Sequence, residues 1–219
     1  MPNTLQDSKV ATQLDRMYTE SKNQMSKLRD MQDQLGRPMT TQERTEAMSE
    51  FYIPVTPESG RLLYALVRAI RPATVVEFGM SFGISAIHLA SAMRDNGTGR
   101  VLTTELSDTK IAAAKQTFAK TGLDSVITIL EGDALSTLAE LDGPVDFVLL
   151  DGWKDLYLPV IKLLEPRLSA GVLVVADNAS APDMRPYLDY VRNPDNGYVS
   201  FNFLARESDS VEVSCRTGD

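Results

Sequence analysis

The sequence predicts an α/β fold: a doubly wound sheet of five parallel strands, followed by a C-terminal antiparallel hairpin and preceded by an N-terminal helical extension. Two observations predict it. Between residues 73 and 191, short apolar runs rich in β-branched residues alternate with stretches of helical spacing, as in successive βαβ units. The runs are apolar at nearly every position, which is typical of parallel strands covered by helices on both faces.

The expected elements follow one another at regular intervals. We expect parallel strands at residues 73–79, 100–105, 125–130, 145–151 and 171–177. We expect helices at 84–93, 109–120, 134–141, 159–168 and 184–191, and an earlier one that begins near Pro57 and stops at Pro72. The final runs, 198–205 and 210–216, alternate apolar and polar residues, which predicts a hairpin at the sheet edge.

The first fifty residues differ from the rest. Residues 8–36 contain no proline, and apolar side chains recur at helical spacing: Val10, Leu14, Met17, Met25, Leu28, Met31 and Leu35. This predicts one amphipathic helix or two in succession, ended by Gly36 and Pro38. We expect residues 1–51 to form an extension that serves as a lid or a dimer contact, or that simply packs on the main domain, residues 52–219.

Composition excludes several classes of protein. The formal net charge of -8 disfavours a nucleic-acid partner, because such proteins usually carry a basic surface. The single cysteine, Cys215, cannot form an internal disulfide. We see no apolar leader at the start and no run of about 18 apolar residues, so we expect no secretory signal, no membrane span and a cytoplasmic protein.

A turn with spaced glycines follows the first expected strand, in VVEFGMSFGISAIHLA. Gly79 and Gly83 let a ligand approach the backbone, and the helix that follows offers free N–H groups to an anion. Glu77 and Ser85 flank these glycines. The spacing is G-x-x-x-G, whereas dinucleotide-binding folds favour G-x-G-x-x-G. The segment is therefore either a cofactor loop of another kind or an ordinary tight turn.

Acidic residues end the second strand and follow the third. Glu105 stands where doubly wound sheets often place a carboxylate that accepts the two hydroxyls of a ribose. Asp133, in EGDA, reaches the same rim. Each carboxylate can instead be a helix N-cap or a solvated loop residue. Because these strand ends share one edge of the sheet, we expect them to hold an adenosine.

The fourth and fifth expected strands end in LLDGWKDLY and VVADN. If the strands are neighbours, Asp151, Asp177 and Asn178 converge, and buried carboxylates repel one another unless a cation or a proton lies between them. Oxygen ligands without His or Cys suit a hard ion: Mg²⁺, or alternatively Mn²⁺ or Ca²⁺. The alternative is that Asp177 and Asn178 only cap the next turn.

Two more side chains of this loop have two readings each. Lys154, if desolvated beside a metal, is a candidate general base, and otherwise it is a surface lysine. Trp153 either walls a pocket for an aromatic substrate or packs in the core. His88, the only histidine, lies between apolar residues of an expected helix, so we expect it to pack. With no second histidine and no reactive cysteine, triad and thiol mechanisms lack their residues.

The segments VVEFGMSFGISA, LTTE, EGDA, LLDGWKDLY and VVADN, in this order and at these spacings, resemble the cation-dependent O-methyltransferases of the catechol O-methyltransferase type. The resemblance covers about residues 52–215. It implies a Rossmann-like sheet and methyl transfer from S-adenosylmethionine to a hydroxyl of a small aromatic substrate, catechol-like or with other vicinal oxygens. The N-terminal region and the final hairpin look more like the bacterial members, many of which are dimers, and so a homodimer is expected.

Carried over residue by residue, the resemblance implies a set of roles. Asp151, Asp177 and Asn178 would bind Mg²⁺, and Lys154 would be the base. The residues implied for the cofactor are Glu77, Gly79 and Ser85 for the methionine part with Val55 nearby, Glu105 for the ribose, Asp133 with Ala134 for the adenine, Trp153 flanking adenine or substrate, and Asp151 as a further contact.

The sequence departs from the family pattern at two places. Gly152 replaces a histidine of the mammalian enzyme, and no carboxylate lies near Val199 or Ser200, where that enzyme grips the second hydroxyl of catechol. Catechol itself is therefore not implied. Two rival functions are a nicotinamide oxidoreductase, which the missing G-x-G-x-x-G disfavours, and a non-catalytic S-adenosylmethionine-binding protein, which has no need for a base beside a metal.

Overall fold

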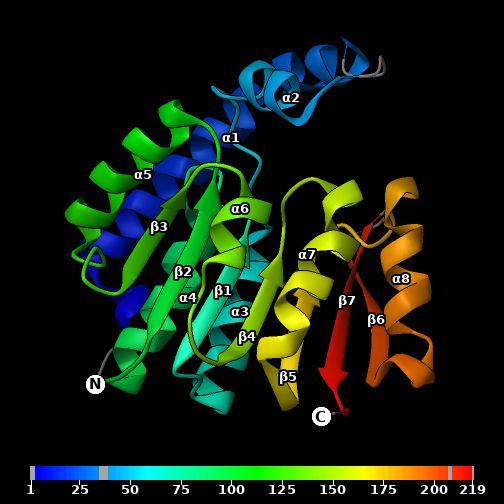
Figure 1. The fold of residues 1–219 in the computed structure, drawn as a ribbon. Coiled ribbons are helices and arrows are strands. Elements are labelled where there is room, and N and C mark those ends of the chain that lie inside the picture. The colour runs from blue at the N-terminus through cyan, green and yellow to red at the C-terminus, as the bar shows by residue number, and fades with distance from the viewer. Residues whose placement is uncertain (1–2, 35–38, 207–208, 219) are drawn as a thin grey trace.

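A seven-stranded sheet forms the centre of the protein, in the order β3-β2-β1-β4-β5-β7-β6 (Figure 1). The computed structural model describes residues 3–34, 39–206 and 209–218. Strands β1 to β5 are parallel, and β7 runs antiparallel to both β5 and β6. The strands are β1 (Thr74–Phe78), β2 (Arg100–Glu105), β3 (Ile127–Glu131), β4 (Val145–Leu150), β5 (Leu168–Ala176), β6 (Tyr198–Arg206) and β7 (Asp209–Arg216). The predicted five parallel strands and edge hairpin are confirmed.

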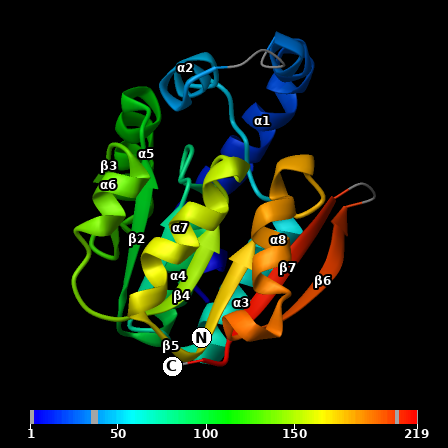
Figure 2. The same cartoon turned by 45° about the vertical axis from the view of Figure 1, so that its right-hand side comes forward.

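Helices cover both faces of the sheet, as the apolar strands require. The helices are α1 (Ser8–Gln34), α2 (Thr41–Ala47), α3 (Pro57–Ile70), α4 (Ile84–Asn96), α5 (Asp108–Thr121), α6 (Ala134–Ala139), α7 (Tyr157–Leu164) and α8 (Arg185–Val191). Apolar residues of α1, α3, α4 and α5 form the core of one face, and those of α6, α7 and α8 the core of the other. Figure 2 shows α7 and α8 lying in front of β4, β5 and β7.

Several element boundaries differ from the sequence prediction by two to four residues, and two of these differences lie next to each other. Helix α7 ends at Leu164, earlier than the predicted residue 168, and a 3₁₀ turn containing Pro166 follows it. Strand β5 therefore begins at Leu168 rather than at residue 171. Its pairing with β4 shifts register between Val145 and Phe147, so the first part of β5 is irregular and breaks the apolar pattern used to find the strand.

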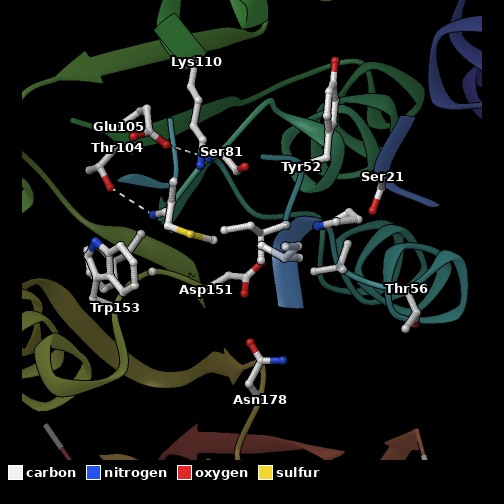
Figure 3. Close-up of a pocket in the computed structure, with 18 of the residues that line it drawn as sticks. Ser21, Tyr52, Thr56, Ser81, Thr104, Glu105, Lys110, Asp151, Trp153 and Asn178 are labelled. Carbon is white, nitrogen blue, oxygen red and sulfur yellow. Dashed lines mark hydrogen bonds between the residues drawn. The ribbon is translucent and has the colours of Figure 1, made fainter. Parts of the chain in front are cut away.

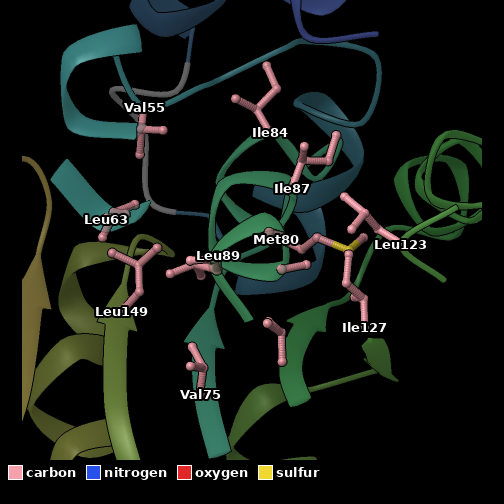
Figure 4. Packing of buried hydrophobic residues seen from close by; sticks show 14 of the residues in the cluster. Val55, Leu63, Val75, Met80, Ile84, Ile87, Leu89, Leu123, Ile127 and Leu149 are labelled. Carbon is pink, nitrogen blue, oxygen red and sulfur yellow. The ribbon is translucent and has the colours of Figure 1, made fainter. Parts of the chain in front are cut away.

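The core of the first face packs around α4, whose side chains are buried on almost every side. Figure 4 shows Met80, Ile84, Ile87 and Leu89 meeting residues from α3 and from the neighbouring strands. A helix enclosed in this way is apolar all round rather than amphipathic. This packing fixes the turn between β1 and α4, which carries the predicted cofactor residues.

The first half of α1 belongs to the same core, and its second half extends beyond the sheet. Val10, Leu14 and Met17 are buried, whereas Met25 is 45% exposed. Asp95 accepts hydrogen bonds from the backbone N–H and the hydroxyl of Thr4, which anchors the start of the chain. Figure 1 shows the second half of α1 and all of α2 above the edge where the parallel strands end. Gly36 and Pro38, at which we expected the helix to end, lie outside the described residues, as does Leu35.

Candidate active site

The carboxyl ends of β1 and β4 meet through two glycines. Gly79 has a φ of +95°, and a Cβ there would lie 2.5 Å from the backbone of Gly152. A Cβ on Gly152 would in turn lie 2.5 Å from the ring of Phe78. The two loops thus approach more closely than any side chain permits, and Phe78 fills the space beside Gly152.

Glu77 is fully buried at the end of β1. Its Oε2 accepts a hydrogen bond from the Thr103 hydroxyl, and its Oε1 has no hydrogen-bond partner among the described residues. Burial raises the pKa of Glu77 to about 7, although the nearby hydroxyls of Ser85 and Thr103 act in the opposite direction. A buried carboxylate oxygen without a donor fits an ammonium group, such as that of a bound methionine moiety.

Val55 belongs to the connection that leads into α3, and Ser85 belongs to the first turn of α4. Val55 is buried and lines the main cavity of the site. Ser85, also buried, lines a separate small hollow with Tyr52, beside the turn. Gly83, the N-cap of α4, makes no side-chain cap hydrogen bond. The first N–H groups of α4 therefore have no side-chain acceptor at the cap and fit a carboxylate.

Glu105 organises the loop at the end of β2. Its Oε2 accepts a hydrogen bond from the backbone N–H of Ser81 at 2.8 Å, and its Oε1 accepts from those of Leu106 and Ser107 at 2.8 and 2.9 Å. Lys110 is almost fully buried nearby, and burial lowers its pKa while the charge of Glu105 opposes that effect. Figure 3 shows the Lys110 side chain running towards Ser81 and Glu105.

Asp133 acts as a helix N-cap, which is one of the two readings that the sequence left open. Its Oδ2 accepts hydrogen bonds from the backbone N–H of Ser136 at 3.2 Å and from the Ser136 hydroxyl at 3.0 Å. Asp133 and the following Ala134 also line the main cavity. A cap and a contact to an adenine ring are compatible, because the second carboxylate oxygen makes no hydrogen bond to a described residue in α6.

Lys154 is a largely buried cation of the site, with 20% of its side chain exposed. Its Nζ lies 3.7 Å from Oδ1 of Asp151 and donates a hydrogen bond to the hydroxyl of Tyr157 at 2.7 Å. The Tyr157 hydroxyl donates to the backbone oxygen of Asp177 at 3.2 Å. Burial lowers the pKa of Lys154, although the nearby charges of Asp151, Asp177 and Asp209 favour its protonated form. The lysine is not a surface residue, and its setting is one in which an amine can exchange a proton.

The three residues predicted to bind a metal lie at the ends of adjacent strands. Leu150 pairs with Ala176, so Asp151 and Asp177 follow at matching positions of β4 and β5, and Asn178 comes next. Asp177 is buried, and Figure 3 shows Asp151 and Asn178 on the same wall of the cavity. Within the described part of the chain, no three His, Cys, Asp or Glu side chains form a group that could hold a metal. The candidate donors are two carboxylates and one amide, all oxygen ligands suited to Mg²⁺.

The side chain of Trp153, in the loop after β4, contacts α2. Its Nε1 donates to the Thr45 hydroxyl at 3.4 Å, and the guanidinium of Arg44 lies 4.7 Å from the ring centroid. Arg44 also forms two hydrogen bonds with Asp155, at 3.0 and 2.9 Å. Helix α2 is thereby held over the loop that carries Lys154.

One cavity of about 1430 Å³ connects these groups with the space under α1 and α2. Its wall includes Gly79, Glu105, Asp133, Asp151 and Lys154. Of the other predicted residues, Glu77 and Asp177 are buried and are not part of the wall. His88 is packed, as predicted, but it also lines the cavity, and its Nε2 lies 3.4 Å from the Tyr18 hydroxyl. The cavity is large enough for a nucleoside-sized cofactor together with a second small molecule.

Sequence reasoning missed several residues of this site. Arg44 and Thr45 were overlooked, although the capping box formed by Thr40 and Glu43 is a readable signal for the start of α2. Tyr157 was inside the quoted loop but received no role. Asp209 carries no local signal, since its place beside Asn178 follows only from the pairing of β7 with β5.

The comparisons with known proteins agree with this geometry. A family model described as a methyltransferase domain matches residues 76–179. Catechol O-methyltransferase B of Danio rerio is 32% identical over 181 residues, covering 77% of this chain and 67% of that protein. The chain belongs to the catechol O-methyltransferase family. As a member of that family it is an S-adenosylmethionine-dependent O-methyltransferase, which removes the oxidoreductase reading.

Two further proteins extend the match. A probable O-methyltransferase of Mycobacterium tuberculosis is 34% identical over 151 residues, covering 64% of each chain. The crystal structure of an O-methyltransferase from Bacillus cereus in complex with SAH superposes with a TM-score of 0.68 at 18% identity, covering 91% of this chain and 99% of that one. At that identity the likeness shows the fold alone.

Among the helices of the described residues, none combines the length and the apolar character needed to cross a membrane.

Proposed function

We propose that this member of the family catalyses a metal-dependent methyl transfer from S-adenosylmethionine to a hydroxyl of a small aromatic substrate with vicinal oxygens. The observation that carries the proposal is the largely buried Lys154, whose Nζ lies 3.7 Å from Asp151 in the loop after β4, beside the end of the neighbouring strand β5. An amine in that position serves to take a proton from a substrate oxygen held beside it.

We assign the metal to Asp151, Asp177 and Asn178. The donor chemistry fits, because two carboxylates and an amide oxygen at matching ends of neighbouring strands are the ligands that a hard divalent cation prefers. When bound, a divalent ion such as Mg²⁺, Mn²⁺ or Ca²⁺ supplies a Lewis acid that lowers the pKa of the acceptor hydroxyl. Lys154 takes the hydroxyl proton on Nζ, and Tyr157 holds that amine in place through the hydrogen bond of 2.7 Å.

We assign the cofactor to the remaining wall of the site. Glu77, Gly79 and Ser85, with Val55, would bind the methionine part. The residues assigned to the rest of the cofactor are Glu105 for the ribose, Asp133 and Ala134 for the adenine, Asp151 as a further contact, and Trp153 as a wall beside adenine or substrate. S-adenosylmethionine supplies the electrophilic methyl group, whose bond to sulfur breaks as the bond to the acceptor oxygen forms.

The acceptor class can be tested directly. Purified protein should transfer a tritiated methyl group from S-adenosylmethionine to one or more members of a panel of catechols, hydroxycinnamates and flavonoids. Transfer should stop in EDTA and return with Mg²⁺, and Asp151→Ala should abolish the metal response. Methyl transfer that is indifferent to EDTA would contradict the metal assignment. Binding of S-adenosylmethionine without transfer to any member of the panel would contradict the proposed acceptor class.

We also propose that residues 1–51 act as a lid and contribute to a homodimer of a cytoplasmic protein. The contacts of Arg44 with Trp153 and Asp155 support the lid. Exposed apolar side chains at Met25, on α1, and at Phe201, on the edge strand β6, support an interface. The lone cysteine fits a reducing compartment. Sedimentation equilibrium distinguishes monomer from dimer.

A further inference from the structure

Asn178 and Asp209 form a pair that the roles above leave unexplained. The Nδ2 of Asn178 donates a hydrogen bond to Oδ2 of Asp209 at 2.6 Å. Asp209 is the first residue of β7, and its other oxygen accepts from the backbone N–H of Ser210 at 2.8 Å. The backbone N–H of Ala179 also donates to the oxygen of Ser210 at 2.8 Å, so the start of β7 is held against the loop after β5.

The hydrogen bond with Asp209 determines the orientation of the Asn178 side-chain amide. An ionised carboxylate only accepts hydrogen bonds, so the amide nitrogen of Asn178 must face Asp209 and the carbonyl oxygen must face away. Asn178 and Asp151 both line the cavity, and Figure 3 shows the side-chain oxygen of Asn178 on the side nearer Asp151. The backbone of Asn178 has a φ of +58°, a conformation that asparagine tolerates better than most residues.

We infer that Asp209 is a positioning residue for the metal site: it holds the Asn178 amide so that Oδ1, and not the N–H group, is presented to the ion. This inference rests on the metal-dependent function proposed above. Without Asp209 the amide is free to turn by about half a rotation and to offer an N–H donor, which a cation repels. Partners of this kind around a metal ligand typically contribute about 10- to 100-fold in metal affinity.

The pair also explains the type of residue at position 178. An aspartate there would place a second carboxylate against Asp209 at hydrogen-bond distance, where like charges are unfavourable. Exchanging the two residues removes that conflict. In the double variant Asn178→Asp with Asp209→Asn, the new amide donates to one oxygen of the new carboxylate and leaves the other oxygen for the ion.

The test is the affinity of the full-length protein for Mn²⁺ without cofactor, measured from the electron paramagnetic resonance signal of free Mn²⁺. Asp209→Ala should weaken binding by about 10- to 100-fold, and Asp209→Asn should also weaken it, because an Asn–Asn pair accepts either amide orientation. The exchanged double variant should bind much more tightly than Asp209→Asn. Asp183→Asn, which removes an exposed carboxylate from the same cavity wall, is the matched control and should bind as wild type does.

The outcomes separate the two proposals. Wild-type protein that binds no Mn²⁺ overturns the metal assignment itself. Wild-type protein that binds Mn²⁺ while Asp209→Ala binds it equally well overturns only the role of Asp209. A loss in Asp183→Asn as large as that in Asp209→Asn reduces the effect to general charge, and it also overturns the inference. Circular dichroism checks that each variant is folded, and if the alanine variant is not, Asp209→Asn and the exchanged variant decide the question.

Discussion

Replacing Gly152 by alanine tests how tightly the ends of β1 and β4 are packed. The new Cβ would lie 2.5 Å from two ring carbons of Phe78, whereas carbon atoms in contact are about 3.5–4.0 Å apart. The ring must therefore move by about 1 Å. It is only 5% exposed and packs edge-on against the fully buried Tyr157, with ring centroids 6.1 Å apart, so it has little free space to enter.

Overpacking of this kind costs about 1–3 kcal/mol. For a chain of 219 residues each kcal/mol lowers the melting temperature by roughly 2–4 °C, so Gly152→Ala should melt about 2–12 °C below wild type. Because Tyr157 carries the hydroxyl that binds Lys154, kcat should fall as well. Calorimetry and steady-state methyl transfer measure the two effects on the same protein samples.

Two further variants isolate the cause. Gly218→Ala is the control, because its Cβ would meet no atom closer than 3.5 Å and its φ lies outside the left-handed region. The double variant Phe78→Leu with Gly152→Ala should lose less stability than the sum of the two single changes, since the smaller side chain makes room for the Cβ. A Gly152→Ala protein that melts at the wild-type temperature refutes the packing argument.

Three other predictions follow from the site. Lys154→Ala should lower kcat by about 100-fold or more while the Kd for S-adenosylmethionine changes little, and equal losses in both would make the lysine structural. Because burial raises the pKa of Glu77 from 4.5 to about 7, the folded state favours its protonated form. Its contribution to stability should therefore be present at low pH and lost between about pH 4.5 and 7, a total change on the order of 3 kcal/mol in the free energy of unfolding. Urea unfolding of Glu77→Gln should show no such loss, and pH profiles parallel to those of wild type would contradict this. Arg44→Ala should speed cofactor release several-fold, because it frees α2 from Asp155. Stopped-flow fluorescence of Trp153, the only tryptophan, can follow the release. An unchanged release rate argues against a lid.

The sequence was most informative where function depends on strand ends. The periodicity and polarity of the sequence locate β4 and β5. Because these strands are neighbours in the sheet, Asp151 and Asp177 come together, and no loop structure has to be predicted to find this. For Glu105 the pattern placed the carboxylate correctly, but not the backbone N–H groups that it accepts. Turn geometry of that kind depends on dihedral angles that no periodicity encodes.

Contacts between distant parts of the chain were out of reach. Arg44 meets Asp155 across 111 positions, and Asn178 meets Asp209 across 31. Each contact depends on how one element docks on another, which a single sequence does not specify. The packing beside Gly152 could not be predicted either. The Phe78 ring fills that space, and whether it does depends on the side-chain volumes where the ends of β1 and β4 meet.

Helix α1 can act as a lever, although its second half is not free: the Gln24 side chain donates a hydrogen bond to the backbone oxygen of Glu50 and accepts one from the backbone N–H of Tyr52. The 27 residues of the helix span about 40 Å, and Asp95 fixes the start of the chain through Thr4 while the far half overhangs the cavity. A tilt of about 10° around its midpoint displaces the far tip by roughly 3–4 Å, since half the helix is about 20 Å long. A small rearrangement near the pivot is therefore amplified at the mouth of the cavity, and altering the side chains at that pivot offers a way to tune access to the site without touching its chemistry.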